Sequence, residues 1–132
     1  MSNLNYRSQF MYSNAGQFVK LLVKVSIGAT GAPTVVSGTG MGIASVTRSA
    51  AGKYVIALSN TFNSLFGVQC ISKSGASAPA APVVAIAADA VSTASAPAVT
   101  IQCYNLSGAA TDPASGEVLY VEIDLNRSSL SN

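Results

Sequence analysis

Apolar and polar positions alternate along much of the chain, most clearly in residues 117–125. There Leu119, Val121, Ile123 and Leu125 fall on one side of the alternation, and mostly polar residues fall on the other. A period of two is typical of a β-strand that has one buried face. The same alternation or short β-branched runs predict strands at residues 18–27, 34–36, 43–48, 53–58, 68–73, 83–88, 98–104 and 117–125.

Glycine, proline and serine interrupt these segments and mark the connections. The Ala-Gly pair at 51–52, flanked by alternating segments, predicts a hairpin over residues 48–54. Phe62, Leu65 and Phe66 are spaced at i, i+3 and i+4, which predicts a single helical turn there. The Ala-rich stretch 76–98 contains three prolines, which argue against a helix.

This pattern predicts an all-β protein of about seven to eight short strands. The fold class we expect is a single-domain β-sandwich, jelly-roll-like, or a small barrel, with long Ala/Ser/Pro loops. The chain has 132 residues, enough for one domain with its own core. We expect an extended N-terminal arm at 1–17, a β domain at 18–125 and a polar C-terminal tail at 126–132.

The charge content is low. Asp, Glu, Lys and Arg make up 9% of the residues, against about 25% in an ordinary soluble domain. Residues 74–111 carry a single charge, Asp89. Either a partner covers part of this neutral surface, since interface cores are depleted of charge, or the loops are simply long and neutral. The seven basic residues are scattered, so we expect no nucleic-acid binding.

The expected cellular location and the redox state of the cysteines follow from the lack of membrane-spanning and signal-peptide patterns in the sequence. No apolar run approaches the length of a membrane span, and the first residues do not resemble a signal peptide. We therefore expect synthesis in a cytoplasm, no membrane contact, and Cys70 and Cys103 as reduced thiols. Both cysteines fall on the apolar side of a predicted strand. A disulfide between them stays open, because spacing does not give the Cα separation.

The inventory of reactive groups argues against an enzyme. The chain has no histidine, the commonest general base and metal ligand. Glu122 and Asp124 share one strand face, as solvated carboxylates do, and Asp112 with Glu117 lacks the spacing of a calcium loop. The glycines at 38, 40 and 42 precede a predicted strand, so they indicate a bend and not a phosphate loop. We expect no catalytic residue, cofactor or metal.

Several turn and strand segments resemble a group of small virion proteins of tailed bacteriophages. They are KVSIGATGAPT (24–34), GIASVTRSAAGKY (42–54), VIAL (55–58), SGAATDP (107–113) and VLYVEID (118–124). The resemblance covers most of residues 10–125, and its motifs are structural rather than catalytic. It implies a capsid decoration (cement) protein: β-rich, oligomeric, often trimeric, and seated on the outside of the shell.

The expected partners are therefore the major capsid protein and further copies of this chain, with a homotrimer as the expected oligomer and the capsid surface as the location. Aromatic residues in the otherwise polar arm predict where it docks. The predicted partner-binding residues are Tyr6, Arg7, Phe10, Met11 and Tyr12. The alternative is a head-fibre or tail-fibre module that binds a receptor or glycan. Its expected mark, aromatic residues in the 74–97 and 107–116 loops, is missing.

Overall fold

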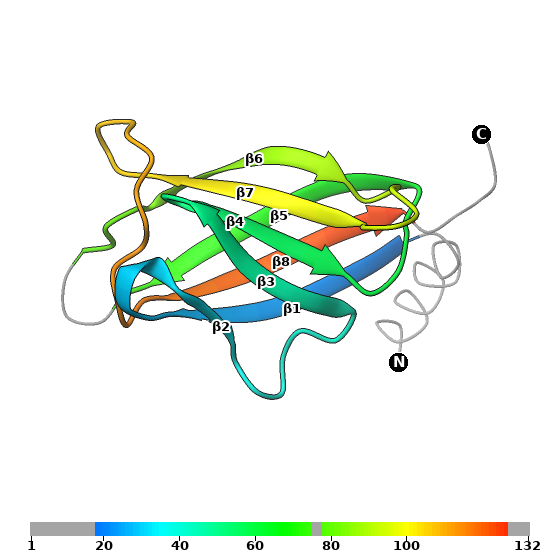
Figure 1. Ribbon diagram of the computed structural model, residues 1–132, viewed down its shortest axis with the longest axis horizontal. Helices are drawn as coiled ribbons and strands as arrows, with labels where there is room; N and C mark the ends of the chain where they lie inside the picture. Colours follow the sequence, from blue (N-terminus) through cyan, green and yellow to red (C-terminus); the bar gives the residue numbers. More distant parts are fainter. Residues whose placement is uncertain (1–17, 75–77, 127–132) are drawn as a thin grey trace, which may run out of the picture.

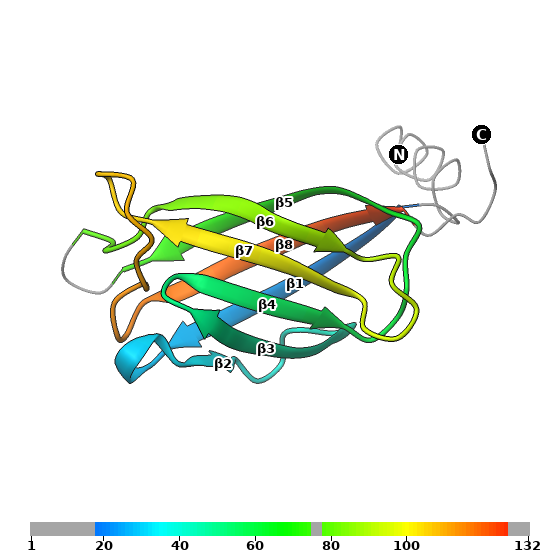
Figure 2. The same cartoon turned by 45° about the horizontal axis from the view of Figure 1, so that its top comes forward.

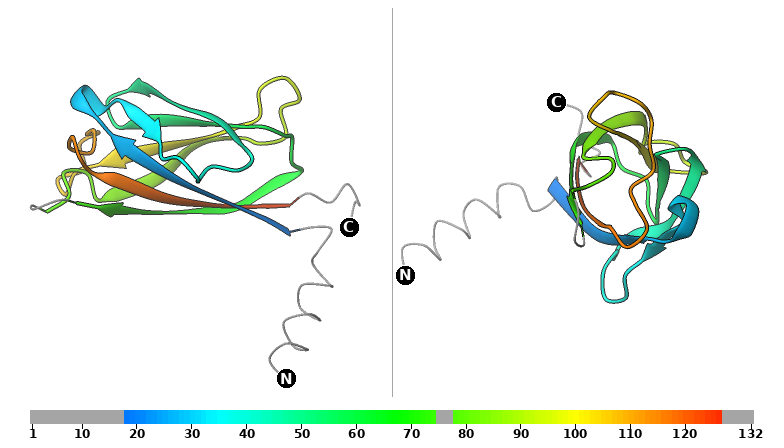
Figure 3. Two further views of the ribbon diagram at one scale, coloured as in Figure 1. Left: turned by 90° about the horizontal axis from the view of Figure 1, so that it is seen from below. Right: turned by 90° about the vertical axis from the view of Figure 1, so that its left-hand side faces the viewer.

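The computed structural model describes residues 18–74 and 78–126, which form a sandwich of two four-stranded antiparallel sheets. Figure 1 shows the strands in two layers, which Figure 3 shows from below and from one end. The strands are β1 (Phe18–Ile27), β2 (Pro33–Val35), β3 (Ile43–Ala50), β4 (Lys53–Leu58), β5 (Ser64–Lys73), β6 (Val83–Ala90), β7 (Ala98–Tyr104) and β8 (Val118–Asn126). A short 3-10 turn, η1 (Ala29–Gly31), joins β1 to β2.

The first sheet has the order β2-β1-β8-β5 and the second has the order β3-β4-β7-β6. Figure 2 shows β5 and β6 along one side of the sandwich, and β2 and β3 along the other. The all-β prediction is confirmed, and of the architectures expected from the sequence the sandwich is the one observed. The described residues form two separate sheets and not a closed barrel.

The core lies between the sheets and consists of the apolar half of each alternation. In β1 and β8 every second residue is buried, because neighbouring side chains of a strand point to opposite faces. Inward side chains of the two sheets meet as in other sandwiches. The most completely buried ones include Val25, Tyr54, Ile56, Val99, Ile101, Leu119, Ile123 and Leu125.

The helical turn expected at Phe62, Leu65 and Phe66 is wrong. Leu65 and Phe66 belong to strand β5, which has a bulge between Leu65 and Gly67. Phe62 precedes the strand, and its backbone N–H donates to Val91 O at 2.9 Å. A bulge adds one residue to a strand and shifts the alternation. The apparent helical spacing therefore comes from a bulge that follows a buried loop residue.

Two carboxylates tie the loops at one end of the sandwich. Asp112 accepts bonds from Arg48 Nε (2.9 Å), Arg48 Nη2 (2.8 Å) and the Gly52 N–H (2.7 Å). The buried Glu117 accepts from Ser72 Oγ at 3.0 Å and from the Ala80 N–H at 2.8 Å. These bonds join segments far apart in sequence. Both carboxylates thus hold the structure together.

The two cysteines follow the prediction for a strand's inner face. Cys103 is buried and Cys70 is half-buried, and both are free thiols. Burial raises the pKa of the Cys70 thiol to about 12 and that of Cys103 to about 11. Neither thiol is therefore ionised near neutral pH, which suits packing and not nucleophilic chemistry.

Candidate functional site

The outer face of the β2-β1-β8-β5 sheet exposes large apolar side chains where a solvated sheet normally carries polar ones. Leu22 on β1 is 58% exposed, and Phe66 and Ile71 on β5 are 59% and 71% exposed. Tyr120 on β8 and Phe18 at the start of β1 are also exposed. We call this surface, formed by the outward residues of β1, β8 and β5, the outer face.

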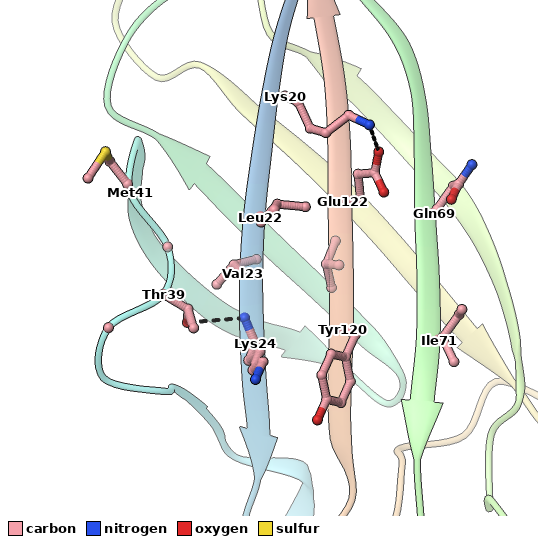
Figure 4. A pocket seen from close by; sticks show the side chains of 13 residues that line it. Lys20, Leu22, Val23, Lys24, Thr39, Met41, Gln69, Ile71, Tyr120 and Glu122 are labelled. Carbon is pink, nitrogen blue, oxygen red and sulfur yellow. Dashed lines mark hydrogen bonds and ion pairs between the residues drawn. The ribbon is translucent and has the colours of Figure 1, made fainter. Parts of the chain in front are cut away.

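Strand register arranges these side chains in rows across the sheet. Leu22 pairs with Glu122, which pairs on its other side with Gln69. In the next row, Lys24, Tyr120 and Ile71 are neighbours in the same way. Figure 4 shows both rows running across β1, β8 and β5. Because cross-strand neighbours lie about 5 Å apart, each row is a continuous contact surface.

The loop after β2 forms a wall along the β1 edge of the outer face. The Gly40 N–H donates to Leu22 O at 3.0 Å, and the Lys24 N–H donates to Thr39 Oγ1 at 3.2 Å. Gly40 has a φ of +81°, and a Cβ there would lie 3.1 Å from Val35 Cγ1. The bend predicted from the glycines therefore lets the loop lie against β1. Met41 projects from it, 91% exposed (Figure 4).

Between this loop and β5 lies an open groove of about 550 Å³. Its floor is formed by the rows described above, with Leu22, Tyr120 and Ile71 as its apolar part. Met41 and Gln69 lie at opposite sides of it (Figure 4). A groove of this size and lining suits an apolar side chain or segment of a partner.

Two lysines of the outer face have partners on the same face. Lys20 Nζ lies 2.6 Å from Glu122 Oε1, and this hydrogen bond raises the pKa of the Lys20 ammonium. Lys24 Nζ lies 5.0 Å from the centre of the Tyr120 ring, within the range of a cation–π contact. Burial, then the charge of Glu122, raises the pKa of Asp124. The ion pair and the cation–π contact thus engage both lysines of β1 within the face.

Two aromatic rings close one end of the outer face. Phe18 and Phe66 stack with their ring centroids 5.9 Å apart and their planes 17° from parallel. Phe18 is the first residue of β1. The segment 1–17 therefore joins the domain at this aromatic end, and the predicted partner-binding residues Tyr6, Arg7, Phe10, Met11 and Tyr12 belong to that segment. They lie outside the described residues, so their role stays a prediction.

The chain has no histidine. Within residues 18–74 and 78–126, no three Cys, Asp or Glu side chains gather as metal ligands do. No helix of this part of the chain has the length and apolarity to cross a membrane. The Asp112 and Glu117 carboxylates accept hydrogen bonds from separate protein donors, the Gly52 N–H and the Ala80 N–H.

Sequence reasoning missed the outer face although the signal was present. Leu22, Phe66 and Tyr120 occupy the outward positions of strands whose inward positions are also apolar. Periodicity identifies the buried side of a strand, but a single apolar residue on the other side forms no periodic pattern that would mark it as part of a surface. Only the pairing of β1, β8 and β5 collects these exceptions into one surface.

No protein-family model, curated protein or solved structure matches this chain. The function is therefore inferred from the geometry of the outer face, together with the resemblance carried by the turn and strand segments.

Proposed function

We propose that this protein is a bacteriophage virion structural protein of the capsid decoration (cement) type, which binds the outside of the shell and bridges major capsid proteins. The observation that carries the proposal is the outer face, a sheet surface on which exposed apolar side chains lie beside the Lys20–Glu122 ion pair. Such a face can bury apolar area against a partner.

Exposed apolar side chains also occur on the second sheet, in the region with one charge. Val83 and Ile86 of β6 are each 47% exposed, and this strand lies inside the neutral stretch 74–111. Large exposed apolar patches on a folded chain mark interaction sites. A particle component that contacts the shell and neighbouring copies needs more than one such surface, whereas a free monomer needs none.

Docking by the outer face is tested by placing charge on it. Replacing Leu22 and Ile71 together by lysine is expected to weaken binding to shells that lack the protein by about a hundredfold, because two central apolar contacts are lost and two charges are desolvated. Co-sedimentation with purified shells measures this. The matched control places lysine at Ser45 and Thr47, two exposed positions of β3 on the other sheet. Equal affinity of both double variants would refute docking by the outer face.

The arm is tested separately. Deleting residues 1–12 is expected to leave the circular-dichroism spectrum of the β domain in place and to abolish binding to shells. The physical reason is the loss of the arm's contacts with its partners, since three aromatic side chains and Met11 bury large areas at low charge cost. Binding of the shortened chain at full affinity would remove the arm from the docking surface.

A second candidate function, a fibre module that binds glycans, is favoured by one observation. Tyr120 exposes an aromatic ring on the outer face, next to the polar side chains of Glu122 and Gln69. A ring beside hydrogen-bonding groups is a surface on which a sugar can stack. A glycan array with the isolated protein distinguishes the two candidates, and the position and copy number of the protein in an electron-microscopy map of the particle separate decoration from fibre.

A further inference from the structure

The side of the sandwich between β5 and β6 is incompletely closed. These two strands are the outermost strands of their sheets and run along the same side (Figures 1 and 2). A groove of about 450 Å³ lies between them. It is lined by Val68 and Cys70 of β5, by Val84 and Ile86 of β6, and by the core residue Ile101. The inner face of the sandwich is thus reachable from this side.

Strand β5 is also a long edge whose bulge is confined to its first residues. It has ten residues and no proline, and its one charge is at its end, Lys73. From Gly67 to Lys73 it pairs with β8 without interruption, and within the described residues it has no second neighbour. Folded proteins normally shorten, charge or cover such an edge, because its unpaired backbone groups accept another strand.

We propose that residues 4–12 of a second copy of this chain add to β5 as a further strand and fill the groove. In this segment Leu4, Tyr6, Ser8, Phe10 and Tyr12 alternate with Asn5, Arg7, Gln9 and Met11. The first set is apolar except for Ser8, which is the period of a strand with one mainly apolar face. Nine residues span roughly 30 Å as a strand, which matches the ten residues of β5. The groove lining carries no charge, and neither does the apolar side of the segment.

The donor is a neighbouring copy because the direct path of the chain's own arm is obstructed. Phe18 and Ser64 are both register partners of Asn126, so β1 and β5 flank β8 at this end. The slot beyond β5 is three strand spacings from β1, roughly 14 Å. Residues 13–17 reach at most roughly 17 Å, so they could enter the slot only along a nearly straight path. That path is obstructed, since the Asn63 N–H binds Asn126 O at 2.8 Å at the end of β8.

This pairing connects the arm with the proposed docking surface. A strand added to β5 sends alternate side chains to opposite faces. With the apolar set turned into the groove, Arg7 and Met11 lie on the outer face beside Gln69 and Ile71. The contact joins two different surfaces, the arm of one copy and the edge of the next, and such contacts close into rings when repeated by rotation. Only the shell-binding role of Arg7 and Met11 rests on the proposed function.

Cysteine scanning of the full-length chain tests the pairing, with the native Cys70 as the reporter in the groove. Tyr6, Ser8 and Phe10 are replaced singly by cysteine, with Arg7, Gln9 and Met11 as matched controls on the other side of the strand. Diamide takes the two thiol hydrogens as the disulfide forms. At least one variant of the first set is expected to give covalent dimers or a ladder on non-reducing gels, while the controls stay at the size of one chain.

The cross-link is expected to vanish when Cys70 is also replaced by serine. The proposal is overturned if no variant of the first set cross-links, if the controls cross-link equally, or if the new disulfide joins two residues of one chain. Light scattering adds a measurement without oxidant: the native protein is expected to exceed the mass of one chain, and a Tyr6→Ser, Phe10→Ser variant to have that mass. Leu22→Lys, added to a variant that cross-links, should leave the cross-link in place, because Leu22 on β1 does not line this groove; this separates the proposal from shell binding.

Discussion

Replacing Gly52 by alanine is expected to lower the free energy of unfolding by about 4 kcal/mol, the sum of backbone strain and overpacking. Gly52 closes the hairpin between β3 and β4 with a φ of +68°, a conformation that strains any residue with a Cβ. The added Cβ would lie 2.5 Å from Cys103 O and 2.7 Å from Thr111 O. Both contacts are with backbone atoms, which cannot move aside as a flexible side chain can.

Gly108→Ala is the matched control for this substitution. Gly108 has a φ of +86°, but a Cβ there would meet no atom within 4 Å. The expected loss is about 1 kcal/mol, from backbone strain alone. Urea unfolding followed by far-UV circular dichroism measures both variants, since the chain has no tryptophan to report by fluorescence. Equal losses would show that the close approach at Gly52 does not constrain the hairpin.

The second large effect is expected for Asp112→Ala, a loss of about 2 kcal/mol from leaving the Gly52 N–H without its acceptor. Gly52 is buried, so water does not replace the lost oxygen. Tyr54 keeps its bond to Gly31 O at 2.9 Å, which limits the damage. Asp112→Asn, which retains one side-chain oxygen as an acceptor, should lose less. Thermal and urea unfolding of the three proteins at neutral pH measure this order.

The same carboxylate gives the stability a dependence on pH. Hydrogen bonds from Arg48 lower the pKa of Asp112 below its ordinary value. A lowered pKa means that Asp112 stabilises the fold above the unfolded pKa of about 3.9, and that this stabilisation is lost as the pH falls through the native pKa. Asp124 has a raised pKa, so its ionisation changes the stability with pH in the opposite direction.

The contribution of Asp112 to stability is therefore measured as the difference in unfolding free energy between two proteins. The gap in unfolding free energy between the native protein and Asp112→Asn is expected to be constant from pH 7 to about 5 and to close below about 4. Asp124 is present in both proteins and cancels. A gap that stays constant down to pH 2 would show that the charge of Asp112 is not what binds Arg48.

Much of the fold was predictable because a strand's alternation is a local property. The predicted strands at 18–27, 53–58 and 98–104 coincide with β1, β4 and β7. The strand predicted at 68–73 begins four residues earlier in the structure, at Ser64. The bulge at Phe66 hides that start, because it changes the phase of the alternation. A local rule fails where the partner strand determines the geometry.

The candidate site was much less predictable than the fold. Leu22, Tyr120 and Ile71 are separated by up to 98 positions and come together only because β8 lies between β1 and β5. The sequence drew attention to the arm instead, since aromatic residues in a polar segment are conspicuous by themselves. The outer face becomes visible once strand order and register are known.

The sequence by itself determined the strand content, the inward half of each strand and the absence of histidine chemistry, because these depend on residue type and on a period of two. Only the tertiary structure decided that the sheets form an open sandwich, that Asp112 clasps Arg48 sixty-four positions away, and that β5 and β6 flank a groove. Strand order joins residues that no local period relates, and the surfaces where this chain can meet its partners are of that kind.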